Sequence, residues 1–138
     1  MKQEKSCGAV VFREEEGRRV YLVLHSVGGH CTLCKGHVEG AETEHETAVR
    51  EIREETGLDV NFVENFRKVI RYSPYSGCMK DVVFFLARVS GGVLRCQASE
   101  VSEAWFLPFE QAMNRLTHLL DQKTLNSAEQ FLSEGENP

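Results

Sequence analysis

Residues 36–58 read GHVEGAETEHETAVREIREETGL, and this segment carries most of the functional information in the chain. Glu51, Glu54 and Glu55 follow the i, i+3, i+4 spacing that places three side chains on one helix face. Like charges at this spacing repel each other by about 0.2–0.5 kcal/mol per pair on an exposed helix. A divalent cation would offset this repulsion, and ligands that offer only oxygen atoms suit Mg²⁺ or Mn²⁺ and not Zn²⁺.

The segment also contains the signals that begin and end a helix. Thr43 followed by Glu46 forms a capping box, which places the N-cap at Thr43. Gly57 stands where a residue with left-handed backbone ends a helix. An apolar stripe beside the acidic residues is expected to pack against the rest of the domain, and it consists of Ala48, Val49 and Ile52.

The alternative interpretation of this helix is a solvent-exposed face that binds no metal. Arg50 can pair with Glu46 and Glu54 across one helical turn, and most glutamate-rich helix faces are of this kind. The flanking glycines, the single arginine and the fixed spacing favour a metal site instead.

The segment resembles the signature of the Nudix hydrolase family, Gly-x5-Glu-x7-Arg-Glu-U-x-Glu-Glu-x-Gly-U, in which U is aliphatic. Every defined position of the signature is met, by Gly36, Glu42, Arg50, Glu51, Ile52, Glu54, Glu55, Gly57 and Leu58. The resemblance implies an α+β domain with the Nudix fold, which is an α/β/α sandwich with a mixed central sheet. It also implies an enzyme that hydrolyses nucleoside diphosphates linked to another group.

Outside the signature, the chain resembles the asymmetrical diadenosine tetraphosphate hydrolases along nearly its whole length. The similar segments are the Lys-Gly-His-Val-Glu run at 35–39, the strand-like run at 80–87, and the Glu-Gln-Phe-Leu run at 129–132. Glu100 also stands six residues before Phe106, as a loop glutamate does in these enzymes. This resemblance implies that water attacks one phosphorus of diadenosine tetraphosphate and yields ATP and AMP.

Two departures from that subfamily concern the substrate and not the metal. Residues 31–34 read Cys-Thr-Leu-Cys where Trp-Thr-Pro-Pro is usual, and Phe84 replaces a usual Tyr. Alternative activities are therefore a Nudix pyrophosphohydrolase that acts on another nucleotide, on a diphosphoinositol polyphosphate or on a 5′-triphosphorylated RNA. An alternative of a different class is a non-catalytic Nudix domain that senses nucleotides.

The resemblance implies a role for each acidic residue of the site. Glu51, Glu54 and Glu55 would bind one to three Mg²⁺ ions, with Mn²⁺ as a substitute. The carbonyl group of Gly36 would complete a site, and Glu100 would be a further ligand. The general base stays open among Glu51, Glu55 and Glu100.

The resemblance also implies residues that bind the substrate and residues that support the site. Phosphate groups would contact His30, Lys35 and Lys80. The candidates for stacking on a base are Tyr72, Tyr75 and Phe131. For each of these residues the alternative is an ordinary surface charge or a core aromatic ring. The supporting residues of the signature are Glu42, which braces the loop, Arg50, which orients a carboxylate, and Gly57, which ends the helix.

Composition indicates one ordinary globular domain. Of the 138 residues, 41% are hydrophobic and 27% are charged. We expect a single domain over residues 1–138, with a frayed tail at 134–138. The net charge of −5 argues against a sequence-independent nucleic-acid binder, so no stable nucleic-acid complex is expected. It does not argue against a nucleotide substrate, because bound cations reverse the sign of the charge locally.

The cysteine content and the short apolar runs bear on the location of the protein. The chain has five cysteines, an odd number, and its longest early apolar run, at 9–12, is too short for a signal sequence or a membrane span. We therefore expect reduced thiols, a cytoplasmic protein without membrane association, and a monomer or weak homodimer. The Cys31-x2-Cys34 pair lacks a second pair and is weak support for zinc.

The rest of the chain alternates between strand and helix patterns. The continuous apolar run at 82–86 predicts a central strand. Residues 26–35 are expected to form a loop, since Gly28 and Gly29 interrupt regular structure. Strands are predicted at 7–13, 19–25, 60–72, 81–89, 93–96 and 104–107, and helices at 109–116 and 121–132.

Overall fold

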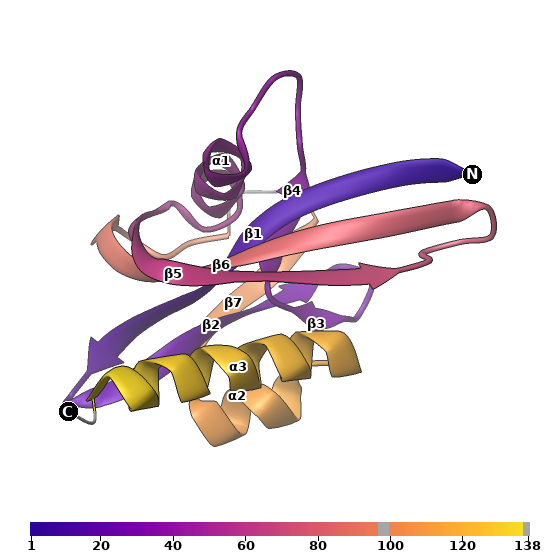
Figure 1. Ribbon diagram of the computed structural model, residues 1–138. Helices are drawn as coiled ribbons and strands as arrows, with labels where there is room; N and C mark the ends of the chain where they lie inside the picture. The colour runs from indigo at the N-terminus through magenta and orange to yellow at the C-terminus, as the bar shows by residue number, and fades with distance from the viewer. Residues whose placement is uncertain (97–99, 137–138) are drawn as a thin grey trace.

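A mixed β-sheet lies between two layers of helices in the computed structural model of the chain, which describes residues 1–96 and 100–136 (Figure 1). Helix α1 covers one face of the sheet, and helices α2 and α3 cover the other. The predicted α+β class and the α/β/α sandwich are therefore confirmed. The elements are β1 (Lys2–Glu15), β2 (Arg18–Ser26), β3 (Cys31–Thr32), β4 (Cys34–His37), α1 (Glu44–Thr56), β5 (Leu58–Tyr72), β6 (Cys78–Gly92), β7 (Val101–Pro108), α2 (Phe109–Arg115) and α3 (Leu119–Glu136).

The two long strands β1 and β6 form the centre of the sheet. Strands β3, β2, β1, β6 and β5 follow one another across it, while β4 pairs with β1 and β7 pairs with β2. Strands β1 and β6 run parallel, and the other pairs of the described residues are antiparallel. The run at 82–86 is buried within β6, which confirms the predicted central strand.

Side chains of the central strands alternate between two hydrophobic cores, because successive residues of a strand point to opposite faces. The core between the sheet and α1 is called the α1-side core, and the core between the sheet and helices α2 and α3 is called the α3-side core. In β1, Cys7, Ala9 and Val11 belong to the α1-side core, whereas Val10 and Phe12 belong to the α3-side core. The helices contribute Ala48 and Ile52 to the α1-side core and Ala112, Leu125 and Ala128 to the α3-side core. Helix α1 is thereby held with its apolar side on the sheet.

Both ends of α1 have the predicted caps. The Thr43 hydroxyl accepts a hydrogen bond from the Glu46 amide (3.1 Å), and the Glu46 carboxylate accepts one from the Thr43 amide (2.8 Å). At the other end, Gly57 has a left-handed backbone with φ of 75°, and its amide donates to the carbonyl of Arg53 (2.9 Å). These bonds satisfy polar groups that a helix leaves free at its termini.

Two predictions for the regions around α1 are wrong. Residues 26–35 are not only loop, because they contain β3 and the first residues of β4. Residues 93–96 do not form a strand. The left-handed backbone of Gly92, with φ of 86°, turns the chain, and the Arg95 amide then donates to the carbonyl of Thr56 (3.0 Å). This segment therefore contacts the end of α1 and leaves the sheet.

The C-terminal helix is longer than its sequence pattern predicts. Helix α3 begins at Leu119 and continues to Glu136, whereas the pattern predicts residues 121–132. The expected frayed tail is helical over residues 134–136, and residues 137–138 lie outside the described part of the chain.

None of the helices in the part of the chain that the structure describes is long and apolar enough to span a membrane.

Candidate active site

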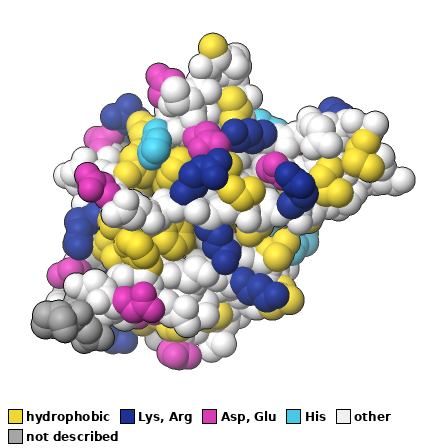
Figure 2. All heavy atoms as spheres, viewed as in Figure 1, with side chains coloured by type: hydrophobic (Ala, Val, Ile, Leu, Met, Phe, Trp, Pro, Cys, Tyr) yellow, Lys and Arg dark blue, Asp and Glu magenta, His cyan; other side chains and the backbone are white. Residues whose placement is uncertain are grey.

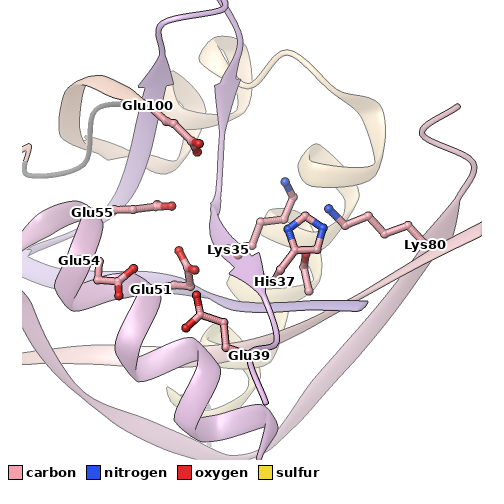
Figure 3. A pocket seen from close by; sticks show the side chains of 10 residues that line it. Lys35, His37, Glu39, Glu51, Glu54, Glu55, Lys80 and Glu100 are labelled. Carbon is pink, nitrogen blue, oxygen red and sulfur yellow. The ribbon is translucent and has the colours of Figure 1, made fainter. Parts of the chain in front are cut away.

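A cavity of about 730 Å³ opens beside α1, at the end of the sheet where β4 and β6 meet β1. Its charges are separated, with acidic side chains on one side and Lys35, His37 and Lys80 on the other (Figure 3). The lining residues are Ser6, Lys35, Gly36, His37, Glu39, Glu51, Glu54, Glu55, Lys80 and Glu100. The cavity thus brings together the predicted metal ligands and two of the three predicted phosphate-binding residues.

Helix α1 presents three of the acids, and β4 leaves room for them. A Cβ atom on Gly36 would overlap the carboxylate of Glu51, so the glycine allows this carboxylate to lie against the backbone of β4. Glu100 reaches the cavity from the turn directly before β7, where its carbonyl accepts a hydrogen bond from the Val27 amide (3.0 Å). Three acids from one helix and a fourth from a segment far away in the sequence therefore line one cavity.

Arg50 holds the acids of the signature in place. Its guanidinium group donates to Glu42 (2.7 Å), Glu51 (2.9 Å) and Glu54 (3.1 Å), and also to the carbonyl of His37 (2.9 Å). A planar group with several fixed donors suits this arrangement better than a lysine would. Arg50 does not line the cavity itself, and its contacts are with the acids and with the backbone of β4.

Glu42 braces the loop before α1 and does not line the cavity. Its carboxylate accepts hydrogen bonds from the Glu39 amide (2.9 Å) and the Thr47 hydroxyl (2.9 Å), in addition to those from Arg50. The Arg50 guanidinium, together with the Glu39 amide, lowers the pKa of Glu42 to about 2. The carboxylate is therefore ionised throughout the neutral range.

Glu55 is a partly buried acid of the cavity. Burial raises its pKa to about 8, and the nearby negative charge of Glu51 adds to the shift. The Cys34 thiol donates a hydrogen bond to its carboxylate (3.3 Å) and opposes the shift in part. Without a cation, the cavity therefore disfavours full ionisation of its acids.

The donor set of the acidic side fits a divalent cation of the Mg²⁺ type. Glu51, Glu54, Glu55 and Glu100 offer carboxylate oxygens, and Gly36 offers a carbonyl oxygen, which are the ligands that hard cations prefer. Among the described residues, no three Asp, Glu, His or Cys side chains are already arranged to hold an ion. A cation held by these acids would require their carboxylates to turn toward it.

Lys80 stands opposite these acids. The residue is 9% exposed on β6, and burial lowers its pKa, with the positive charge of Lys35 adding to the effect. An anion between the two ammonium groups would offset their mutual repulsion and would favour the charged form of the buried Lys80. The basic side of the cavity is thus suited to phosphate.

Lys35 also lines two smaller hollows that adjoin the main cavity. One, of about 260 Å³, contains His30, whose ring stacks on that of His118 with 5.1 Å between centroids. The other, of about 430 Å³, is lined by Tyr72 and by Asp121. His30 and Tyr72 therefore lie beside the main cavity and not in it.

Two of the predicted stacking residues lie elsewhere. The Tyr75 hydroxyl donates to Glu4 (2.9 Å) near the turn between β5 and β6, and Tyr75 does not line the Tyr72 hollow. Phe131 packs edge-to-face on Phe66 with 5.5 Å between ring centroids, within the α3-side core. Its ring therefore helps to anchor α3 on the sheet, and a role of Phe131 in stacking on a base stays a prediction.

Sequence reasoning missed several residues around these cavities, namely Ser6, Glu39, His118 and Asp121. Asp121 is 3% exposed, and burial raises its pKa. An acid in the first turn of an amphipathic helix is usually a solvent-exposed capping group, so the sequence contains no signal for its burial. The one available signal for Ser6 was a lone hydroxyl at the start of an apolar strand.

Comparisons with known proteins agree with this geometry. The model of the NUDIX domain family matches residues 2–128. The asymmetrical bis(5′-nucleosyl)-tetraphosphatase of Mus musculus is 31% identical over 140 residues, which cover 93% of this chain and 95% of the mouse protein. The same enzyme of Sus scrofa is 32% identical over 141 residues, with equal coverage. A crystal structure of a C. elegans Ap4A hydrolase binary complex matches with a TM-score of 0.86 at 24% identity, over 95% of this chain and 98% of that one.

Proposed function

This chain belongs to the Nudix family and is a Nudix hydrolase, and we propose that it hydrolyses diadenosine tetraphosphate to ATP and AMP with Mg²⁺. The observation that carries the proposal is the cavity in which Glu51, Glu54 and Glu55 face Lys35 and Lys80. A phosphate chain needs cations on one side and fixed positive charge on the other, and this arrangement supplies both. The similarity to the mouse and pig tetraphosphatases supports a dinucleoside polyphosphate as the substrate.

The metal would bind on the acidic side of the cavity. We assign the ligands to Glu51, Glu54 and Glu55, with Glu100 and the Gly36 carbonyl as further ligands. Mg²⁺ is the proposed ion, and Mn²⁺ has the same ligand preferences and would replace it. When bound, the cations neutralise the charge of the phosphate chain and favour attack by water. Arg50 keeps the carboxylates of Glu51 and Glu54 oriented through the hydrogen bonds described above.

The remaining chemistry belongs to side chains of the protein. The proton of the attacking water passes to one of the carboxylates Glu51, Glu55 and Glu100, which all line the cavity. Lys80 and Lys35 hold phosphate oxygens and orient the phosphorus toward the water. Charge on the leaving phosphate is stabilised by the same ammonium groups.

The two adjoining hollows suit the nucleoside ends of the substrate. Lys35 lines the main cavity and both hollows, so a phosphate chain that contacts it can place a base beside Tyr72. The hollow around Tyr72 is also lined by Pro74 and Leu119, which provide apolar walls for a flat ring. His30 would contact the phosphate chain from the smaller hollow.

The proposed partner is a nucleotide and not a nucleic acid. On the face that Figure 2 shows, basic and acidic side chains are interspersed. The arginines of the edge strand β5 are used in ion pairs, Arg67 with Glu44 (2.7 Å) and Arg71 with Asp81 (2.6 Å). Paired charges of this kind contribute little to the attraction of a phosphate backbone.

The test is a substrate panel in the presence of Mg²⁺, with separation of the products by chromatography. We expect kcat/KM for diadenosine tetraphosphate to exceed that for ATP, 8-oxo-dGTP and ADP-ribose by at least about tenfold, which is roughly 1.4 kcal/mol of transition-state binding. The physical reason is that a longer phosphate chain can contact the cations and both lysines together. In heavy-oxygen water, the label should enter only one of the two products.

Several outcomes of this panel would contradict the proposal. Equal rates on all four compounds, or two ADP molecules as products, would exclude the asymmetrical reaction and leave the family assignment intact. Binding of the nucleotides without turnover of any of them would favour a nucleotide-sensing domain instead. A Glu51→Gln variant serves as the matched control, since it keeps the shape of the side chain and removes its charge.

A further inference from the structure

The hydroxyl group of Ser6 has no hydrogen-bond partner. Among the buried side-chain nitrogen and oxygen atoms of the described residues, the Ser6 oxygen is the one without a hydrogen-bond partner. Ser6 is 0% exposed, yet it lines the main cavity. A buried hydroxyl without a partner destabilises a fold, and nearly all such groups in native proteins are paired. The orphaned hydroxyl therefore indicates a partner that arrives with a ligand.

The register of the sheet places Ser6 between the two lysines of the cavity. Ser6 on β1 stands opposite His37 of β4 and opposite Val82 of β6. Since strand side chains alternate, Lys35 and Lys80 lie two residues along from these partners and on the same face as Ser6. Such diagonal neighbours are about 7–8 Å apart, which is close enough for both to contact one bound group.

The backbone next to Ser6 keeps this position open toward Lys35. The next residue of β1 on the same face is Gly8, which is paired with Lys35. A Cβ atom on Gly8 would overlap the backbone of Cys34 and Lys35, so no side chain fits between the serine and this lysine. Figure 3 shows Lys35, His37 and Lys80 together on the side of the cavity that faces the acids.

We propose that Ser6 is a phosphate-binding residue, whose hydroxyl donates a hydrogen bond to a phosphate oxygen held between Lys35 and Lys80. The two ammonium groups attract the anion, and the hydroxyl fixes one of its oxygens, because a neutral donor adds direction where two mobile charges do not. The inference rests on the proposed function only in taking the ligand to be a phosphate chain. It requires neither adenine nor turnover.

The experiment measures binding of a ligand that has no nucleoside. The ligand is diimidotriphosphate, a non-hydrolysable analogue of a triphosphate chain. Its dissociation constant is determined by calorimetry in the presence of Mg²⁺ for the wild type and for Ser6→Ala. We expect Ser6→Ala to bind the analogue roughly tenfold more weakly, the effect of one hydrogen bond to a charged oxygen. Its melting temperature without ligand should equal or exceed that of the wild type, since the variant removes an unpaired hydroxyl.

Two further variants make the result specific. Ser90→Ala removes an exposed hydroxyl of β6 and should change neither the affinity nor the melting temperature. Ser6→Cys keeps a group of similar size but offers only a weak donor, so it should also lose affinity. With diadenosine tetraphosphate as substrate, Ser6→Ala should raise KM more than it lowers kcat.

The outcomes separate a ligand contact from a structural role. Unchanged affinity for the analogue in Ser6→Ala, or full affinity in Ser6→Cys, would overturn the proposal. A lower melting temperature together with weaker binding would also overturn it, because it would show that the hydroxyl supports the fold. If the analogue binds as expected while diadenosine tetraphosphate is not hydrolysed, the proposed substrate fails and the role of Ser6 stands.

Discussion

Glu55 is an acid of the cavity whose ionisation is disfavoured both by burial and by a neighbouring charge. Its pKa is raised from 4.5 to about 8 by burial first and by the charge of Glu51 next. A raised pKa means that the folded protein favours the protonated acid. The metal-free protein therefore loses stability as pH rises from about 4.5 through about 8.

We expect Glu55→Gln to remove this dependence. In EDTA, its melting temperature minus that of the wild type should be near zero below pH 4.5 and should become increasingly positive up to pH 8. With Mg²⁺, its kcat should fall by about 10²-fold or more, because a proposed ligand is lost. Glu54→Gln, whose side chain is 56% exposed, is the control, with a similar loss of kcat and little change in melting temperature. Unfolding of both variants would show that these acids are structural.

Lys80 is the buried cation of the site. Burial and the charge of Lys35 lower its pKa, so the charged form of Lys80 is destabilised in the protein without ligand. We expect Lys80→Ala to raise KM for diadenosine tetraphosphate by about tenfold or more, with a much smaller effect on melting temperature. Steady-state kinetics and thermal unfolding measure the two effects, and Lys123→Ala on the exposed side of α3 is the control. An unchanged KM with a large drop in melting temperature would remove Lys80 from the site.

At the scale of elements, the loop before α1 is tied to the helix by ion pairs of Arg50, the shortest of them with Glu42 (2.7 Å). Arg50 lowers the pKa of Glu42 to about 2 and joins the loop, the helix and the carbonyl of His37 on β4. A lowered pKa means that the pair stabilises the fold above the ordinary pKa of 4.5. That contribution is lost as pH falls through about 2.

We expect Glu42→Gln to lower the melting temperature at pH 7. The difference from the wild type should shrink as pH falls below about 4.5, because Glu42 of the unfolded wild-type chain then binds a proton while the folded carboxylate stays charged, which favours unfolding. Thermal unfolding in buffers from pH 7 to pH 3 measures this change. Glu110→Gln, an exposed acid in the first turn of α2, serves as the control. A difference that stays constant over this range would mean that the hydrogen bonds from Glu39 and Thr47, and not the charge, hold the loop.

At the scale of the whole molecule, the active cavity joins the two faces of the sheet. The acids of α1 belong to one helical layer, while Lys35 and Lys80 lie on the strand face that α3 covers. A phosphate chain that binds cations and lysines together must pass around the end of the sheet. Neither layer alone would provide both charges.

We therefore expect activity to depend on a divalent cation. EDTA should abolish turnover, and Mg²⁺ or Mn²⁺ should restore it. Without a cation, the negative charges of the carboxylates in the cavity would repel the phosphate groups of the substrate. Chromatographic measurement of the ATP and AMP formed in metal-depleted buffer, followed by readdition of each ion, tests this dependence. Zn²⁺ at the same concentration is the control, since the site offers no preferred arrangement of soft ligands. Full activity without metal would contradict the assignment of the acids.

The sequence by itself determined helix α1 and the acids on it. The caps at Thr43 and Gly57 and the spacing of Glu51, Glu54 and Glu55 depend on residues within a turn of one another, so a local pattern records them fully. The apolar run at 82–86 likewise predicted a central strand, because a strand buried on both faces has apolar side chains at successive positions. The Nudix signature lies within this local information.

Tertiary structure alone decided which distant side chains join those acids. Ser6, Lys35 and Lys80 meet because β1 pairs with both β4 and β6, and strand pairing depends on burial over the whole chain and not on any local pattern. Phe131 shows the same limit from the other side. An apolar residue at this position of a helical pattern can belong either to the core or to a binding site. The packing of Phe131 on Phe66 is visible only in the tertiary structure.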